Sequence, residues 1–153
     1  MSSFDIALAS ESDHEWCAEL MAGTDPWITL GRGLEECRTA CHHRDYLLFV
    51  AREGVERCGF VLLHPRGLAS SPYIASIATA REFRGKGIGS RLLAFAEGYV
   101  RPQSRHIFLC VSSFNTGAKA LYERQGYTVV GELKDYILKG ASELIMHKSL
   151  EES

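Results

Sequence analysis

Long apolar runs are missing from this sequence. Its longest uncharged apolar stretches, residues 46–51 and 107–111, are far shorter than the roughly 20 residues that a helix needs to cross a bilayer. Residues 1–8 also lack the cationic region and the following apolar stretch of a secretory signal. These absences predict a protein that does not span a membrane and that is located in the cytoplasm.

An excess of positive charge is absent as well. Lysine and arginine total 17 against 19 for aspartate and glutamate, which gives a net charge of −2. Proteins that bind nucleic acids or anionic membranes over a broad surface carry an excess of cations. We therefore expect neither a nucleic acid nor a membrane as a partner, and any anion site must be local.

Paired cysteines are lacking too. An odd number of five forms no disulfide framework, and in a chain without a secretory signal we predict reduced thiols. Cys37 and Cys41, followed by His42, place zinc-type ligands one helical turn apart, but no second pair follows at zinc spacing. Small buried cysteines on a helix stripe explain the pattern better, so no metal site is predicted. The five are Cys17, Cys37, Cys41, Cys58 and Cys110.

Length and composition are those of an ordinary globular protein. A chain of 153 residues is sized for one domain with its own core. The hydrophobic share of 46% and the charged share of 24% are typical of folded proteins. No internal repeat and no low-complexity segment interrupts the sequence. We predict a single domain over residues 1–153.

Periodicity in the first half of the chain predicts strands and two helices. A loop at residues 24–31 holds Trp27 and Ile28 between proline and glycine, which is typical of a pocket wall. Pro65 and Pro72 bracket a second expected loop. The expected elements are a strand at 4–9, a helix ending at Met21 before Gly23, a helix at 34–44, strands at 46–51 and 58–63 joined by a turn at 53–56, and a strand at 73–79.

The second half of the chain predicts a strand–helix alternation. A helix with an apolar stripe begins at Ile88 and ends before Pro102. The following elements are a strand at 106–111, a polar turn at 112–115, a short helix closed by Gly126, and strands at 127–131 and 143–148. Crossovers make a parallel pair and hairpins make antiparallel pairs. We expect an α/β (α+β) fold: a three-layer sandwich with a mixed central sheet between helices.

A glycine-rich turn links the strand at 73–79 to the helix at 88. It reads Arg84-Gly85-Lys86-Gly87-Ile88-Gly89, with three glycines and two cations. Glycine permits positive φ and leaves backbone N–H groups uncovered, and the first helical turn adds unpaired donors and a positive dipole end. The turn is therefore predicted to bind an anion such as a phosphate.

Two motifs make the chain resemble the GNAT superfamily of acyl-CoA-dependent N-acetyltransferases. Arg84-x-x-Gly87-x-Gly89 matches the pyrophosphate motif of that family, and Asn115-x-x-Ala118-x-x-Leu121-Tyr122-x-x-x-Gly126-Tyr127 matches its second motif. The resemblance covers residues 46–150 well and the first 45 residues loosely. The pattern from Asp135 to Met146 is similar to the subgroup that acetylates N-terminal alanines of ribosomal proteins.

The resemblance implies a GNAT fold with a mostly antiparallel sheet and acetyl-CoA as the cofactor. In the family, the pyrophosphate lies on the glycine turn and the pantetheine arm lies along the preceding strand. Asn115 would bond the arm, or would simply cap the helix that follows it. The implied cofactor-binding residues are Ile77, Ala78, Thr79, Arg84, Gly85, Lys86, Gly87, Ile88, Gly89, Ser90 and Asn115.

The resemblance also implies direct transfer of acetyl to a primary amine in a ternary complex. Tyr122 matches the position of the acid that protonates the leaving thiolate; the alternative is that it only packs beside Leu121. The carboxylate that many relatives carry on the strands at 73–79 or 106–111 is missing. The general base is left open among water, Tyr73, Glu143 and His147. Cys110 could form an acyl-enzyme, but a cysteine in an apolar strand is more often inert.

The acceptor site in this family lies between two loops, here residues 25–33 and 134–142. Trp27, Tyr73 and Tyr136 are the predicted substrate contacts, and the acceptor is a small-molecule amine or a peptide N-terminus. A monomer or homodimer is expected. The alternatives are a non-catalytic module that senses acyl-CoA, which the missing carboxylate favours, and an interaction domain that binds no CoA.

Overall fold

A seven-stranded sheet forms the centre of the computed structural model, which describes residues 3–151. Its strand order is β1-β2-β3-β4-β5-β7-β6, and β4 with β5 is the one parallel pair in the described part of the chain. The mixed, mostly antiparallel sheet expected from the sequence is thus confirmed. The strands are β1 (Phe4–Leu8), β2 (Leu47–Glu53), β3 (Glu56–Leu68), β4 (Ser71–Thr79), β5 (His106–Ser112), β6 (Thr128–Lys134) and β7 (Ser142–Ser149).

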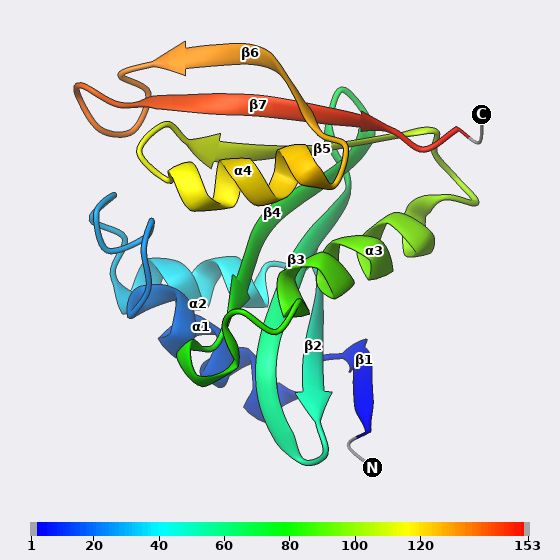
Figure 1. Cartoon of the computed structure of the whole chain (residues 1–153). Helices are drawn as coiled ribbons and strands as arrows, with labels where there is room; N and C mark the ends of the chain where they lie inside the picture. The colour runs from blue at the N-terminus through cyan, green and yellow to red at the C-terminus, as the bar shows by residue number, and fades with distance from the viewer. Residues whose placement is uncertain (1–2, 152–153) are drawn as a thin grey trace.

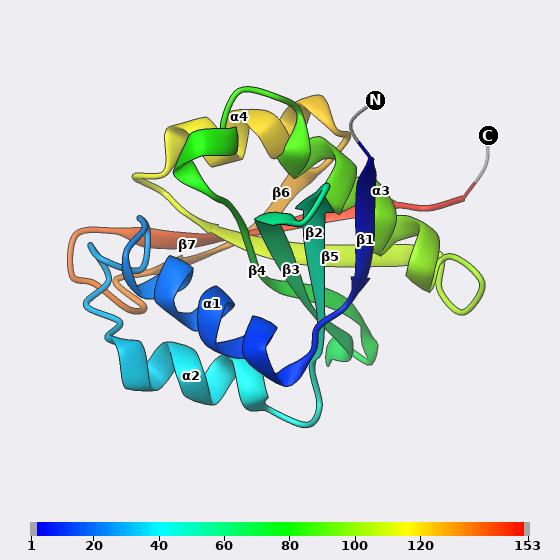
Figure 2. The same ribbon diagram turned by 90° about the horizontal axis from the view of Figure 1, so that it is seen from below.

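Helices cover both faces of the sheet. Figure 2 shows α1 (Glu11–Ala22) and α2 (Leu34–His42) on one side, and α3 (Ile88–Val100) and α4 (Thr116–Arg124) on the other. A 3-10 helix, η1 (Arg81–Phe83), precedes α3. The three-layer arrangement predicted from the alternation of apolar patterns is therefore present.

The core has two parts, one on each face. Along β2, Phe49 and Ala51 pack under α3, whereas Leu48 and Val50 pack under α1 and α2. Because successive strand residues point to opposite faces, a continuous apolar run such as that of β2 is what a strand covered on both sides requires. All five cysteines are free thiols, and Cys17, Cys37 and Cys41 belong to the core beneath α1 and α2.

The sheet divides between β4 and β5. These two strands pair only at Tyr73 with Phe108 and at Ile74 with Leu109. Beyond those pairs they diverge: Figure 1 shows β4 running downward and away from β5, with β1 and β2 in the lower part of the picture and β5–β7 at the top. The pairing of β4 with β3 shifts register at Ala75, so a bulge bends β4 at the point where it leaves β5. The divergence opens a gap in the sheet.

Gly59 allows β3 to fit closely between β4 and α3. A Cβ atom at this position would lie 2.7 Å from the Ala78 carbonyl oxygen and 3.2 Å from Leu92 Cδ1. The first contact is with backbone, which cannot move away as a flexible side chain does. Glycine at this position therefore lets the first turn of α3 pack against the sheet just where the chain leaves β4.

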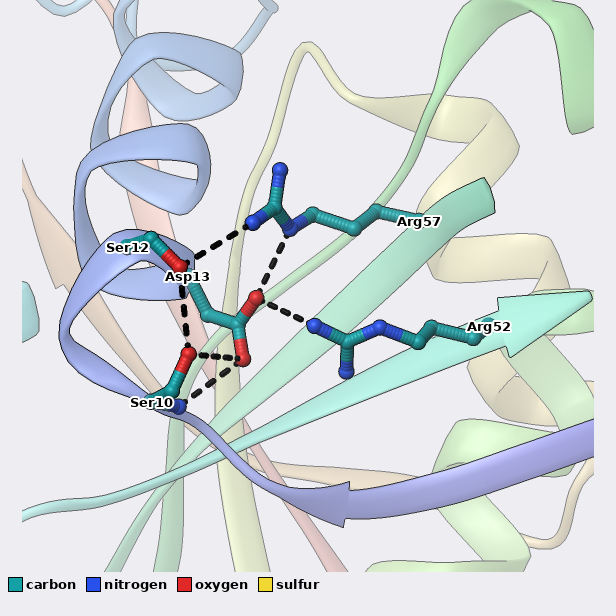
Figure 3. Close-up of polar contacts among 5 residues, drawn as sticks. All are labelled: Ser10, Ser12, Asp13, Arg52 and Arg57. Carbon is teal, nitrogen blue, oxygen red and sulfur yellow. Dashed lines mark hydrogen bonds and ion pairs between the residues drawn. The ribbon is translucent and has the colours of Figure 1, made fainter. Parts of the chain in front are cut away.

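The start of α1 is tied to the hairpin of β2 and β3 through Asp13. This side chain is 1% exposed. It accepts hydrogen bonds from the Ser10 N–H (2.8 Å) and from Arg57 Nε (2.7 Å), and it forms an ion pair with Arg52 (Figure 3). Arg52 and Arg57 lie directly opposite each other across the hairpin and would repel. The carboxylate between them neutralises that repulsion and fixes α1 on the sheet.

The prediction of a loop between Pro65 and Pro72 is wrong. β3 continues to Leu68 and β4 begins at Ser71, so the two strands form one long hairpin with only Ala69 and Ser70 in its turn. The register shifts between His64 and Leu68, and such an irregular stretch accommodates a proline that cannot donate a ladder hydrogen bond. The other boundaries differ by a few residues, for instance α2 ends at His42 rather than at 44.

The Ala69-Ser70 turn offers a stability test. Both residues have positive φ, 49° and 64°, as in a type I′ turn, which favours Asn-Gly. Because a non-glycine residue in this region costs roughly 1–2 kcal/mol, the double variant Ala69→Asn, Ser70→Gly should raise the free energy of unfolding by about 1 kcal/mol. Urea denaturation measures it. Gly54→Ala, at the positive φ of 63° in the β2–β3 turn, should have the opposite sign. No gain from the double variant would contradict the turn geometry.

Two further structural findings bear on function. Among residues 3–151, no helix is long and apolar enough to cross a membrane. The same residues contain no group of three or more His, Cys, Asp and Glu side chains arranged to hold a metal ion.

Candidate active site

A cleft of about 1160 Å³ occupies the gap between β4 and β5. Residues 73–80 of β4 and its extension form one wall, and residues 109–112 of β5 form the other. The loop after α1 closes one end, and α4 contributes Leu121 and Tyr122. The cleft thus passes through the sheet and is reached by side chains from both of its faces.

The glycine turn lies at the end of β4 beside this cleft. Gly85 and Gly87 have φ values of 78° and 80°, and α3 begins directly after Gly87. Within the described chain, the backbone N–H groups of residues 85–90 donate to no protein acceptor, and the first helical bond here runs from Arg91 N–H to the Gly87 carbonyl. A row of free donors at a helix start is the arrangement that binds phosphates. The predicted anion site therefore has the required local geometry.

Arg84 and its neighbours place positive charge next to those donors. Arg84 Nε donates to the Thr79 carbonyl oxygen at 3.3 Å, which holds the turn against the end of β4. Lys86 Nζ lies 5.4 Å from the centre of the Phe83 ring, and Arg81 lines the cleft. Of the predicted cofactor-binding residues, Ile77, Ala78, Thr79, Arg84, Gly89 and Asn115 line the cleft itself, whereas Gly85, Lys86, Gly87, Ile88 and Ser90 form the adjoining turn.

The edge of β4 that faces the cleft is open over residues 75–79. On its other side this segment pairs with β3, for example Val61 with Ile77. Because β5 has diverged, the backbone groups of this segment that point away from β3 have no ladder partner in the described chain. Unpaired strand groups favour an extended ligand that completes the ladder.

Asn115 is the N-cap of α4. Its side-chain oxygen accepts from the Ala118 N–H at 3.4 Å, and the residue also lines the cleft. The capping role considered from the sequence is therefore present. A contact from Asn115 to the cofactor stays a prediction.

Tyr122 brings a hydroxyl group to the cleft from α4. Its ring is 7% exposed and stands edge-on to Tyr127 with ring centres 6.3 Å apart. Burial raises the pKa of Tyr122 to about 12, so the phenol stays protonated at neutral pH. No residue of the described chain bonds this hydroxyl, and no fully buried side-chain oxygen there lacks a partner, so the Tyr122 oxygen is open to the cleft.

Tyr73 and Cys110 lie on facing strands at the point where β4 and β5 separate. Burial, together with the neighbouring Cys110, raises the pKa of Tyr73. Burial also raises the pKa of the Cys110 thiol, although the nearby Tyr73 hydroxyl opposes this effect. Both groups are neutral at pH 7, and a protonated thiol is a poor nucleophile. The geometry therefore does not support an acyl-enzyme on Cys110.

The two other side chains considered as bases lie in different places. Glu143 of β7 lines the cleft, is 9% exposed, and accepts a 2.6 Å hydrogen bond from the Ser112 hydroxyl. His147 lies away from the cleft, with its Nε2 atom 2.9 Å from His106 Nδ1. Burial and the neighbouring His106 lower the pKa of His147. Of these two residues only Glu143 lines the cleft, so its position favours Glu143 over His147 as the base.

The predicted acceptor residues are only partly brought together. Trp27 and Tyr73 line the cleft, and Ile137 of the β6–β7 loop lines it as well. Tyr136 is 67% exposed and is not part of the cleft wall, so its role as a substrate contact stays a prediction. Tyr46 and Glu36 line the cleft although the sequence did not single them out. No local motif marks these two residues. The packing of α2 on the sheet places Glu36, and Tyr46 directly precedes β2.

The chain belongs to the acetyltransferase (GNAT) family. The family model matches residues 11–127, which include β2–β5, the glycine turn and Tyr122, whereas β1, β6 and β7 lie outside the matched range. The resemblance noted in the motifs is thereby confirmed, and so is the fold that it implied.

Among curated proteins, the chain is similar to the 5-NmdU N-acetyltransferase of Pseudomonas phage PaMx11. The two are 30% identical over 93 residues, which cover 61% of this chain and 64% of the phage protein. The matched region thus spans slightly less than two thirds of that relative.

Solved structures agree on the fold. A GNAT-family protein from Desulfovibrio desulfuricans has a TM-score of 0.85 at 18% identity, over 97% of this chain and 100% of that one. The ribosomal-protein-S18-alanine N-acetyltransferase of Escherichia coli has a TM-score of 0.77 at 17% identity, over 99% and 96%. An aminoglycoside 6′-N-acetyltransferase, with a TM-score of 0.77 at 17% identity over 97% and 98%, was solved as a complex with coenzyme A.

Proposed function

We propose that this protein is an acetyl-CoA-dependent N-acetyltransferase that modifies a primary amine. The observation that carries the proposal is the hydroxyl of Tyr122, which is protonated, lines the cleft between β4 and β5 and has no hydrogen-bond partner among residues 3–151. A phenol in that state can donate a proton to a departing thiolate. The alanine N-acetyltransferase and the aminoglycoside N-acetyltransferase among the structural neighbours support an amine as the acceptor.

The cleft fits coenzyme A in three respects. The free N–H groups of residues 85–90 match a pyrophosphate, and Arg81 and Arg84 add positive charge beside them. The open edge of β4 over residues 75–79 matches the amide groups of the pantetheine arm. When bound, acetyl-CoA supplies an acetyl group on a thioester.

The residues of this chain then act on two sides of that thioester. Unpaired N–H groups of residues 75–79 stabilise negative charge on the acetyl oxygen, as donors aimed at a developing oxyanion do. Tyr122 gives its proton to the sulfur that leaves. The rest of the cleft holds the amine in line with the acetyl carbon, which replaces a collision by a fixed geometry.

The acceptor is a small-molecule amine or a peptide N-terminus. The phage relative and the structural neighbours have different acceptors in their names, namely 5-NmdU, a ribosomal-protein alanine and aminoglycosides. The acceptor end of this cleft combines Trp27 and Tyr73 with acidic side chains such as Glu143. This mixture favours an amine attached to an apolar body.

A thiol-release assay tests the proposed activity. Purified protein is incubated with acetyl-CoA and a panel containing phenethylamine, spermidine, kanamycin and an alanine-starting peptide, and free thiol and acetylated product are measured. We expect transfer to at least one amine. Tight binding of acetyl-CoA in calorimetry without transfer would instead support the non-catalytic sensing module. No binding at all would contradict both.

The glycine turn gives a separate test of cofactor binding. The double variant Arg84→Ala, Gly87→Asp should weaken acetyl-CoA binding at least about 30-fold, because it removes one charge-assisted contact and adds a negative charge beside the phosphate site, each worth about 1 kcal/mol or more. Calorimetry measures the change. Gly98→Asp, on an exposed position of the same helix with free space around it, is the matched control and should bind normally. Equal affinities would rule out this turn as the phosphate site.

A further inference from the structure

Three carboxylates are buried in the described part of the chain: Asp13, Glu97 and Glu143. The first two are neutralised by cations. Asp13 pairs with Arg52 and Arg57, and Glu97 receives Lys148 Nζ at 2.9 Å. A buried charge without a partner of opposite sign is costly, so such pairing is the usual condition for a carboxylate inside a protein. Glu143 is the exception.

Glu143 has a hydroxyl partner but no cation. Ser112 Oγ donates to Oε2 at 2.6 Å, and no lysine, arginine or histidine of the described chain lies within ion-pair distance of either oxygen. Oε1 has no protein partner, and because no fully buried oxygen in the described chain lacks one, Oε1 must be open to the cleft. Glu143 is therefore the buried carboxylate of the cleft, and it has a free acceptor oxygen.

Strand alternation places Glu143 across the sheet from Tyr122. Val111 of β5 belongs to the core with Tyr122 beneath α3 and α4, so Ser112 points to the opposite face. Glu143 is the cross-strand partner of Ser112 and shares its face. The two polar groups thus reach the gap between β4 and β5 from opposite sides. The amine nitrogen and the leaving sulfur are two different substituents of one tetrahedral carbon, so a base and an acid that approach from different directions can act on one each.

We infer that Glu143 binds the ammonium group of the acceptor and takes its proton before transfer. Ser112 holds the carboxylate in position. The inference rests on the proposed acetyltransferase function. It assigns to β7 the carboxylate that the sequence lacks on β4 and β5.

The proton and bond changes balance as follows. The acceptor ammonium gives one proton to Glu143 and becomes a neutral amine with a free electron pair. That pair forms the nitrogen–carbon bond to the acetyl group, and the carbon–sulfur bond breaks with its electrons going to sulfur. Sulfur takes the proton of Tyr122, the nitrogen loses its second proton to water as the amide forms, and the Tyr122 phenolate recovers a proton from water. The net products are an acetamide, a free thiol and one proton on Glu143, which passes to solvent.

The surroundings of Glu143 define the acceptor class. The titratable groups that face it are Tyr73 of β4 and Cys110 of β5, both neutral at pH 7, and Leu133 lies opposite it on β6. Glu143 therefore offers one buried negative charge for one ammonium group, and the more exposed Glu19, Asp25 and Glu36 also line the cleft. Tyr46 and Trp27 add aromatic walls. A primary amine with an apolar or aromatic body fits these surroundings.

The test compares Glu143→Gln with a matched variant of the same hairpin. Glutamine keeps the size of the side chain and can still accept from Ser112, but it binds no cation and takes no proton. Glu132→Gln is the control, because Glu132 on β6 also accepts a serine hydroxyl, from Ser142, but it is exposed and points to the other face. Both are assayed with acetyl-CoA and phenethylamine, and acetyl-CoA binding is measured by calorimetry.

Glu143→Gln should lower kcat/KM for phenethylamine about 50-fold at pH 7, a loss typical of removing a proton acceptor, with unchanged acetyl-CoA affinity. The deficit should shrink above pH 9, where more of the amine is already neutral in solution. Glu132→Gln should match the wild type.

Three results would overturn the inference. Equal kcat/KM in the wild type and Glu143→Gln would overturn it while leaving the proposed function intact. A pH-independent deficit would show that Glu143 is only structural. If the wild type acetylates no amine, the proposed function fails first. Calorimetry of phenethylamine with CoA present then decides whether Glu143 binds an ammonium group. Equal affinities of the wild type and Glu143→Gln for phenethylamine would overturn the inference as well.

Discussion

Replacing Tyr122 by phenylalanine should lower kcat for acetyl transfer by about 100-fold or more. Removal of a general acid typically costs 10²–10⁴ in rate, and the Tyr122 hydroxyl is open to the cleft without any competing partner in the described chain. The ring and its edge contact with Tyr127 are retained in the variant. The affinity for acetyl-CoA should therefore stay the same, and steady-state kinetics with calorimetry separates the two effects.

The pH dependence of wild-type activity tests the same role of Tyr122. Because burial raises the pKa of Tyr122 to about 12, the acid form persists across the usual assay range. Loss of this acid should cause no fall in wild-type activity below about pH 11. Tyr99→Phe is the matched control, since Tyr99 lies on α3 away from the cleft and is 45% exposed. Full turnover by Tyr122→Phe would remove Tyr122 from the chemistry.

Asp13→Asn should lower the free energy of unfolding by about 3 kcal/mol at pH 7. Removing the charged member of a buried ion pair costs roughly 3–5 kcal/mol, and the lower end applies here because Arg52 and Arg57 are each 30% exposed and keep contact with water. The variant also leaves two like charges opposite each other on the hairpin. Urea or thermal denaturation measures the loss.

Acid denaturation tests the direction of the pKa shift of Asp13. Burial opposes ionisation of Asp13, but hydrogen bonds from Ser10 and Arg57 and the charge of Arg52 lower its pKa from 3.8 to about 2. A lowered pKa stabilises the fold above the unfolded value, and this contribution is lost as the pH falls from about 4 to 2. The wild type should lose about 2–3 kcal/mol in that window and Asp13→Asn much less. Asp5→Asn, at an exposed position of β1, is the control; equal slopes in all three proteins would contradict the assignment.

The order of the elements and the local geometry of the glycine turn could be predicted from the sequence. The apolar runs of β2, β3 and β5 and the stripe of α3 carry their own periodicity, and the turn at 84–89 combines strand, glycines and helix within a few residues. Such elements can be recognised in the sequence because their patterns do not depend on contacts with distant segments. The family motifs extend over the same contiguous stretches.

The acceptor end could not be predicted in the same way. Glu143 faces the cleft because β7 pairs with β5 in a register that sets it beside Ser112, 31 residues earlier in the chain. The Asp13 cluster likewise joins α1, β2 and β3. Such contacts depend on register and packing, which single residues do not encode. The Ala69-Ser70 turn was missed because it lacks the Asn-Gly signal that normally marks a tight hairpin.

The divergence of β4 and β5 gives the sheet an inner edge in addition to the outer edges at β1 and β6. Outer strand edges are open to any passing polypeptide and are where sheets aggregate. The inner edge lies between the helices that cover the two faces of the sheet, α1 and α2 on one side and α3 and α4 on the other (Figure 2). An edge inside the sheet is therefore less accessible to the strands of other proteins than the outer edges at β1 and β6.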